Sequence, residues 1–335
     1  MGEITVNTIK EDIDKSQWKA LENSSTASFF QTEECYDFYE SLPRIFNPFV
    51  VSVDEDGVLK GVVVGYVTKE CLFLKNKLTR RAIIIGGPMI ADDISDQALC
   101  ALLNKTKKLL RHKAIYIETR NFSDYSIHKA VFENCGFKYQ EHLNFKIDTS
   151  SEDVVNANMG KSRKRDAKAA LRKGAVIVSD PDYEDLKAYY AILKNLYKTR
   201  VKTPLFPFPF FRRLYESDFC KFIMLKYEGK VIGGTVCVDF NNKVMYEWFA
   251  CGEDRECKSL YPSNLATYAG IMYAAEHGYD CFDMMGAGKP DEGYGVREFK
   301  AKFGGKLVEH GRFLCVNKKI LYFIGKCAVS FLKSR

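Results

Sequence analysis

Two stretches of the chain share one pattern, an apolar run, a short polar turn and a second apolar run. The first, 53–64, has its turn at an acidic residue followed by Gly57. The second, 225–236, has the same turn at Gly229, and a further glycine comes four residues later in both. An acidic residue followed by glycine favours a tight turn between β-strands. The pattern therefore predicts two equivalent β-hairpins, separated by 172 positions.

The segments after each hairpin also come in the same order. An apolar run is followed by a helix with apolar residues every three to four positions, then by a short strand and a closing strand that contains Glu-His. We infer a duplicated α/β unit, with domains at 1–148 and 149–316 and a turn-rich boundary near 149–153. The second unit adds a helix at about 184–200. We predict no helix in the proline-rich segment 203–211 that follows.

Composition narrows the class of protein. A net charge of +7 over 335 residues is mild, so only a local basic cluster would indicate a polyanion partner. Eleven cysteines are scattered without a C-x-x-C pair, which favours reduced thiols in a cytoplasmic protein. The five histidines lack the spacing of metal ligands, and we expect no metal. No stretch is long and apolar enough to predict a bilayer span.

Three segments carry a resemblance to a known family. A basic helix ends in Lys-Gly at 161–174, Ser-Asn-Leu opens a helix at 263–265, and an F-K-x-x-F-G motif lies within 293–305. Together with the element order, they resemble the Fem (FemABX-like) family of aminoacyl and acyl transferases. The resemblance implies two tandem GNAT-like domains of the acyl-CoA N-acyltransferase fold, each a mixed, largely antiparallel sheet flanked by helices. It also implies that the tail, 317–335, packs on the first domain.

The resemblance implies an activity as well. We expect a cytoplasmic transferase that moves an aminoacyl or other acyl group to an amine of a peptidoglycan precursor, or of a related glycan or lipid, in cell-wall biogenesis. Neither half contains the glycine-rich turn that opens a helix and holds the pyrophosphate of coenzyme A, so aminoacyl-tRNA is the expected donor and no cofactor is predicted. Two alternatives stay open. One is an N-acyltransferase that uses an acyl thioester on a sugar or lipid amine, and the other is a non-catalytic RNA-binding or scaffold protein.

Catalytic residues are predicted from the motif and from strand ends. Lys300, in the F-K-x-x-F segment, is expected to stabilise the oxyanion of acyl transfer or to hold donor phosphates. An acceptor ammonium must lose a proton, and Asp283 or Glu247 is a candidate base.

Substrate-binding residues are predicted from a loop and from the basic helix. The glycine-rich loop 286–295 is a candidate substrate rim. Seven basic residues within 161–173 are expected to bind phosphate. The predicted contacts are Lys289, Asp291, Tyr294, Arg297, Lys302, Arg163 and Arg165.

The tail has a second interpretation. Its apolar residues Ile320, Phe323, Ile324 and Phe331 are accompanied by lysines, which is also typical of a helix lying on a membrane surface. Exposure of those residues would favour peripheral contact with the inner face of the membrane over packing on the first domain.

Overall fold

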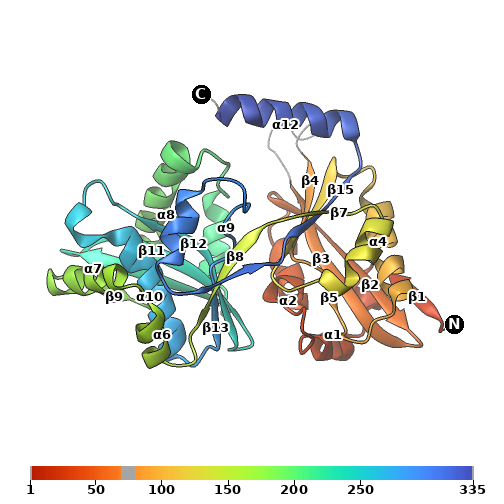
Figure 1. Ribbon diagram of the computed structural model, residues 1–335, viewed down its shortest axis with the longest axis horizontal. Coiled ribbons are helices and arrows are strands. Elements are labelled where there is room, and N and C mark those ends of the chain that lie inside the picture. Colours follow the sequence, from red (N-terminus) through yellow and green to blue (C-terminus); the bar gives the residue numbers. More distant parts are fainter. Residues whose placement is uncertain (1, 69–79, 334–335) are drawn as a thin grey trace. The chain divides into compact units, whose positions relative to one another are not determined.

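The computed structural model describes residues 2–68 and 80–333, with the side chains of 328–333 left out. Cys71 lies outside these ranges. The chain forms two compact units (Figure 1). Unit 1 comprises Met1–His142 and Glu309–Arg335, and unit 2 comprises Leu143–Val308.

Unit 1 is built on one sheet with the strand order β1-β2-β3-β4-β6-β15-β7, and β5 pairs with β3. Only β4 and β6 pair in parallel among its described strands. The strands are β1 (Ile4–Asn7), β2 (Phe46–Glu55), β3 (Val58–Thr68), β4 (Arg81–Gly86), β5 (Met89–Ile90), β6 (Tyr116–Asn121), β7 (Lys138–Gln140) and β15 (Arg312–Val316). The helices are α1 (Lys15–Leu21), α2 (Glu33–Glu40), α4 (Asp96–Leu110), α5 (Lys129–Asn134) and α12 (Lys319–Lys333), with 3-10 turns at Lys10–Asp12, Phe29–Gln31 and Ser126–His128.

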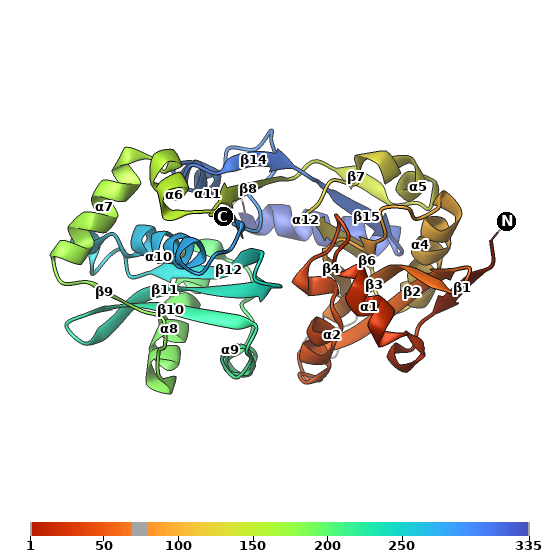
Figure 2. The ribbon, with the colours of Figure 1, turned by 90° about the horizontal axis from the view of Figure 1, so that it is seen from below.

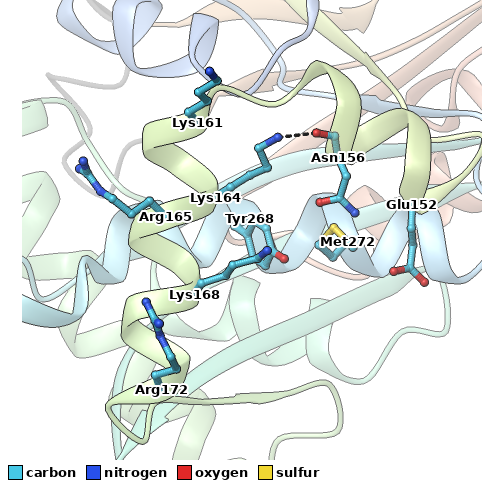
Figure 3. Close-up of a pocket in the computed structure, with 9 residues that line it drawn as sticks. All are labelled: Glu152, Asn156, Lys161, Lys164, Arg165, Lys168, Arg172, Tyr268 and Met272. Atoms are coloured by element: carbon cyan, nitrogen blue, oxygen red, sulfur yellow. Dashed lines mark hydrogen bonds between the residues drawn. The ribbon is translucent and has the colours of Figure 1, made fainter.

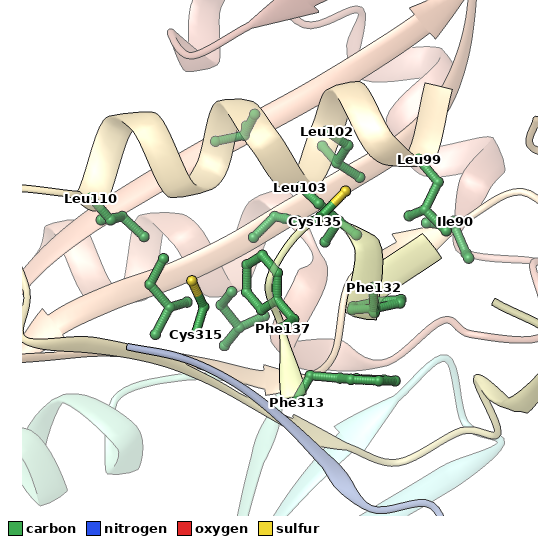
Figure 4. Packing of buried hydrophobic residues seen from close by; sticks show 14 of the residues in the cluster. Ile90, Leu99, Leu102, Leu103, Leu110, Phe132, Cys135, Phe137, Phe313 and Cys315 are labelled. Carbon is green, nitrogen blue, oxygen red and sulfur yellow. The ribbon is translucent and has the colours of Figure 1, made fainter. Parts of the chain in front are cut away.

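The core of unit 1 lies beneath α4. Ser95 caps this helix by accepting a hydrogen bond from the backbone N–H of Ala98. Apolar residues recur every three to four positions along α4, so one face is buried against β2 and β3. Figure 4 shows the leucines of this face above Phe132, Phe137 and Phe313.

Unit 2 is built on a second sheet with the strand order β14-β8-β13-β12-β11-β10-β9. Among its described strands β12 and β13 pair in parallel, whereas β9–β10, β10–β11, β11–β12 and β8–β13 are antiparallel. The strands are β8 (Leu143–Asp148), β9 (Val176–Val178), β10 (Cys220–Tyr227), β11 (Lys230–Phe240), β12 (Val244–Gly252), β13 (Cys281–Asp283) and β14 (Lys306–Glu309). The helices are α6 (Glu152–Asn158), α7 (Lys161–Arg172), α8 (Tyr183–Leu196), α9 (Phe208–Tyr215), α10 (Pro262–Glu276) and α11 (Gly295–Ala301), with a π-helical turn at Tyr197–Val201 and a 3-10 turn at Lys258–Leu260.

Helix α10 is central to unit 2. It is buried on nearly every side, because it packs on β10, β11 and β12 while α6 and α7 cover its other face. This arrangement explains why its sequence is apolar almost throughout, whereas α4 is apolar on one face only. Figure 2 shows α10 between the sheet and the layer that contains α6 and α7.

The two predicted hairpins form with matching geometry. Asp56 and Gly57 have φ of 52° and 78°, and Glu228 and Gly229 have φ of 49° and 76°. Positive φ at both central residues characterises the turn that suits the twist of paired strands. A β-bulge follows Val53 in β2 and Leu225 in β10, which are again 172 positions apart. The hairpins and their bulges are therefore equivalent in the two units.

The unit boundaries differ from the predicted ones. Strand β8 belongs to the second sheet, although the predicted first domain extends to 148. Strand β15 belongs to the first sheet, although the predicted second domain extends to 316. Each closing strand has thus been exchanged between the halves of the repeat. A constant sequence offset does not reveal this exchange, since both halves keep the same order of elements.

The segment 203–211 was expected to contain no helix, but α9 begins at Phe208. Pro207 is its N-cap and Pro209 lies in its first turn, where the missing N–H has no helical partner to lose.

The expected packing of the tail on the first unit is seen at Tyr322, whose ring packs against Tyr116 of β6, but it is wrong for three of the tail's apolar residues. Ile320, Phe323 and Ile324 are exposed by 78%, 67% and 57%. Phe331 lies outside those residues.

Candidate functional site

In unit 2, strands β12 and β13 separate after a short parallel pairing. Their ladder ends at Tyr246 and Asp283, while β12 continues to Gly252. A β-bulge places Trp248 as an extra residue in β12 opposite β11. Bulges redirect neighbouring side chains and are frequent beside active sites. The three predicted catalytic residues, Glu247, Asp283 and Lys300, come together at this point.

Lys300 projects from α11 toward the turn that follows β13. Its ammonium donates hydrogen bonds to the backbone carbonyls of Met284 and Gly286, the latter at 2.8 Å. Burial lowers the pKa of Lys300, while the carboxylates of Glu247 and Asp283 act to raise it. An ammonium has three N–H groups. Among the described residues only those two carbonyls accept from it, which leaves one N–H for a ligand.

Asp283 is fully buried and organises the same turn. Its Oδ1 accepts from Asn144 Nδ2 and from the backbone N–H of Met285, both at 2.8 Å. Asn144 Oδ1 in turn accepts from the N–H of Gly286 at 2.7 Å. Burial raises the pKa of Asp283 against the opposing effects of Lys146, these hydrogen bonds and Lys300. Its Oδ2 has no hydrogen-bond partner among the described residues.

Glu247 lies on β12 and is 7% exposed. The hydroxyl of Thr235 donates to its carboxylate at 3.4 Å. Burial raises the pKa of Glu247, and Lys300 together with hydrogen bonds from Thr267 and Thr235 opposes the rise. Glu247 is thus a buried carboxyl with a raised pKa, close to a lysine whose pKa burial lowers, and such perturbed pairs are candidates for proton transfer.

The three sequence segments that carry the family resemblance meet in unit 2. The guanidinium of Arg163, from the basic helix α7, stacks on Phe299 and Phe303 at 4.4 and 5.1 Å from the ring centroids. Asn264, from the helix-opening motif, donates to the backbone carbonyl of Arg163 at 3.2 Å. The N–H of Gly160 donates to the carbonyl of Lys302 at 3.0 Å. These contacts hold α11, and with it Lys300, against α7 and α10.

Arg163 therefore has a different place from the predicted one. Its stacking and its 3.4 Å hydrogen bond to the carbonyl of Phe299 make it a support for the Lys300 segment rather than part of a phosphate surface. Burial lowers its pKa. Lys302 likewise contributes its backbone carbonyl to the contact with Gly160, while its side chain is exposed.

The predicted loop residues lie on an exposed rim. Arg297 donates to the carbonyl of Lys289 at 2.5 Å and to that of Glu292, so it braces the loop from inside. Lys289 and Glu292 form an exposed ion pair of 3.3 Å. Tyr294 is 42% exposed, and Asp291 is also exposed.

A cavity of about 650 Å³ lies along the basic helix (Figure 3). Figure 3 shows basic side chains spread along the length of α7, with Tyr268 and Met272 contributed by α10 and Glu152 and Asn156 by α6. Arg165 is among them, and it also pairs with Asp166 at 2.9 Å. The remaining basic lining residues are Lys161, Lys164, Lys168 and Arg172. We call this cavity the basic groove.

Two helix N-termini that could hold a pyrophosphate are already capped. In α10, the backbone N–H and the hydroxyl of Ser263 donate to the carboxylate of Asp254 at 3.1 and 2.7 Å. In α4, Ser95 accepts from the N–H of Ala98 and Asp96 occupies the first turn. An acidic residue at such a site repels an anion. Within the described part of the chain, no group of three His, Cys, Asp or Glu side chains is placed to hold a metal ion.

Sequence reasoning missed Asn144, Asn264, Thr235 and Thr267. Asn144 was missed because its strand was assigned to the first domain. Thr235 and Thr267 lie in apolar strings that gave no signal beyond core packing. Only Asn264 belongs to a recognised motif, and its contact with Arg163 could not be derived from spacing.

Comparison with known proteins identifies the fold. Residues 158–300 match the model of an acetyltransferase (GNAT) domain. FemX superposes with a TM-score of 0.71 at 16% identity, over 96% of this chain and 99% of FemX. L-PGS from Bacillus licheniformis gives 0.57 at 14%, over 97% and 98%, and a tandem GNAT protein from the clavulanic acid biosynthesis pathway gives 0.58 at 12%, over 94% and 99%. No curated protein matches the sequence.

The predicted fold class is confirmed by these matches. The chain has a tandem GNAT fold like that of FemX. Fold similarity at such low identity does not specify a substrate.

Proposed function

We propose that the protein is a Fem-like transferase that moves an aminoacyl group from an RNA-borne ester to an amine of a cell-wall precursor. The observation that carries the proposal is the ammonium of Lys300, held by the carbonyls of Met284 and Gly286 where β12 and β13 separate. A fixed cation with one N–H to spare can stabilise the oxyanion formed when an amine attacks an ester carbonyl.

The proposed chemistry uses the two neighbouring carboxyl groups differently. The acceptor ammonium first loses a proton to Glu247, whose raised pKa suits it for that role. The free amine then forms the new C–N bond and the ester C–O bond breaks, and the leaving oxygen takes up the proton that the attacking nitrogen loses. Asp283 positions the turn that orients Lys300, through its bonds to Asn144 and Met285.

Two features favour an RNA-borne donor over coenzyme A. The capped N-termini of α10 and α4 offer poor sites for a pyrophosphate, because Asp254 and Asp96 carry negative charge there. The basic groove, in contrast, presents a row of cations along α7. Such a row suits a chain of phosphates.

The test is a transfer assay with the purified protein. Aminoacyl-tRNA and a uridine-diphosphate-linked peptide precursor are incubated with it, and mass spectrometry follows the precursor. The expected product is heavier by one aminoacyl residue, and acetyl-coenzyme A in place of the charged tRNA is expected to give none. Transfer from the thioester alone would replace the proposed donor, and the absence of any acyl transfer would contradict the enzymatic assignment.

A further inference from the structure

Helix α12 in unit 1 presents an apolar face that packs against nothing in the described part of its unit. Ile320, Phe323 and Ile324 are exposed by 78%, 67% and 57%. Single exposed apolar side chains are ordinary, but three on adjoining turns of one helix form a contiguous patch. Cys327 is also exposed and continues the same face, because it lies four residues after Phe323 and three after Ile324, and residues at these spacings share one side of a helix.

The opposite side of α12 is anchored. Asn317 Nδ2 donates to the carbonyls of Leu110 and Ala114 at 3.3 and 3.2 Å, just before the helix begins. The ring of Tyr322 then packs edge-on against Tyr116 of β6, with 5.4 Å between centroids. At 100° per residue, Tyr322 lies about 160° around the helix from both Ile320 and Ile324. Because Tyr322 contacts unit 1, these two residues point away from it. The exposed face is a consequence of how the helix is held.

Charge indicates what this face meets. The segment 317–335 contains Lys318, Lys319, Lys326, Lys333 and Arg335 and no acidic residue. At 100° per residue, Lys319 and Lys326 fall within about 20° of each other, along one border of the apolar face. An apolar stripe bordered by lysines suits the boundary of a bilayer, where acyl chains take the apolar residues and anionic headgroups take the ammonium groups.

We propose that α12 docks unit 1 on an anionic lipid surface, with Ile320, Phe323 and Ile324 inserted at the headgroup boundary and Lys319 and Lys326 among the headgroups. The helix does not cross the bilayer, and no helix in the described residues is long and apolar enough to do so. This docking is independent of the transfer reaction proposed above, and its test does not require activity.

The experiment is flotation of the purified full-length protein, kept reduced, with vesicles of phosphatidylcholine alone or mixed with phosphatidylglycerol. The wild-type protein is expected to float with the mixed vesicles and to remain at the bottom with the neutral ones. The triple variant Ile320→Ser, Phe323→Ser and Ile324→Ser is expected to bind the mixed vesicles at least about tenfold more weakly. Its thermal midpoint is expected to stay at the wild-type value, since all three side chains are exposed.

Two further variants separate this proposal from others. Lys319→Glu with Lys326→Glu is expected to weaken binding about tenfold or more at low salt, because each basic residue near an anionic surface contributes severalfold to affinity. The matched control, Val58→Ser with Ile127→Ser, removes exposed apolar residues elsewhere in unit 1 and is expected to change nothing.

Three outcomes would overturn the proposal. The first is wild-type protein that does not float with the mixed vesicles, and the second is a triple variant that binds them as tightly as wild type. A concentration-dependent dimer in sedimentation velocity, lost in the triple variant while vesicles are not bound, would instead identify a second copy of the chain as the occupant.

Discussion

Both units have buried charged residues near corresponding strands, but the carboxylates of the two units differ in how they are paired with basic residues. In unit 1, Glu118 on β6 lies between two arginines, with Arg312 at 2.7 Å and Arg120 at 3.3 Å. In unit 2, β13 has the same place in the sheet as β6, and there Asp283 and Glu247 lie near the ammonium of Lys300, while Lys146 also acts on Asp283. The first cluster has two arginines for one carboxylate, whereas the second has two lysines for two carboxylates.

The pKa values follow that difference. The arginines lower the pKa of Glu118 despite its burial. Burial raises the pKa of Glu247 and Asp283, and the lysines nearby, Lys300 for both and Lys146 for Asp283, offset that rise only in part. Pairing with the arginines favours the ionised form of Glu118, whereas a raised pKa makes it easier for Glu247 and Asp283 to take up a proton. The comparison therefore supports a structural role for the unit 1 cluster and is consistent with the catalytic role proposed above for the unit 2 cluster.

The largest effect is expected from Lys300→Ala. Loss of a charge stabiliser of the oxyanion typically costs ~10²–10³ in rate, and we expect a decrease in kcat of that size in the aminoacyl-transfer assay. Lys302→Ala is the matched control, because that side chain is exposed two residues away. If both variants turn over at the wild-type rate, the ammonium of Lys300 has no part in the reaction.

Next in size is the effect of Glu118→Gln on stability. Removing one partner of a buried ion network typically costs about 3 kcal/mol, and here it leaves Arg120 and Arg312 uncompensated. Glu247→Gln is expected to lower the thermal midpoint far less, because burial already penalises its charge, while lowering kcat by about 10²-fold.

Scanning calorimetry and the transfer assay, applied to both variants, measure this contrast. A Glu118→Gln protein that loses activity at full stability would reverse the two assignments.

A smaller effect separates the two glutamates by pH. The folded-state pKa of Glu118 is lowered, so its contribution to stability is present above the ordinary value of 4.5 and is lost as pH falls. The folded-state pKa of Glu247 is raised, so the folded state loses stability as pH rises from 4.5 through that raised pKa.

Thermal midpoints measured from about pH 4 to about pH 8 test these signs. The deficit of Glu118→Gln relative to wild type is expected to shrink toward acid pH. Glu247→Gln, which cannot ionise, is expected to gain on wild type as pH rises. Parallel curves for the two variants would show that the clusters do not differ in this way.

Local signals in the sequence were sufficient for the elements and for part of the site. The turns at Gly57 and Gly229 require positive φ. An acidic residue followed by glycine favours such a turn, so both hairpins were predictable from the sequence. Lys300 was predicted from its motif, and Asp283 and Glu247 from their positions in or at the end of strands, and the structure places the three near one another.

What failed depends on long-range placement. The exchange of β8 and β15 leaves the element order unchanged, and so the boundaries at 148 and 316 were wrong. Arg163 belongs to a basic run whose members look alike in sequence, yet it packs on Phe299 while Lys168 and Arg172 line the basic groove. Packing of α7 against α10 and α11 determines which of its side chains are covered. This packing depends on residues far away in the sequence, so the basic run alone could not predict it.

The smallest expected effect concerns the basic groove of unit 2, and it compares RNA binding by that groove with RNA binding by the surface of unit 1. Lys168→Glu with Arg172→Glu reverses two exposed groove residues and is expected to weaken binding of deacylated tRNA about tenfold at low salt. Fluorescence anisotropy across a salt series should also show a slope of log affinity against log salt that is shallower by about 1–2, because fewer counterions are released.

Two controls separate the groove from net charge and from packing. Lys108→Glu with Arg111→Glu reverses two exposed charges at the end of α4 in unit 1 and should leave both the affinity and the slope unchanged. Arg163→Gln should leave the slope unchanged too while lowering the thermal midpoint, since that guanidinium stacks on Phe299 and Phe303. Equal losses from the unit 1 and unit 2 reversals would mean that net charge, and not the groove, attracts the RNA.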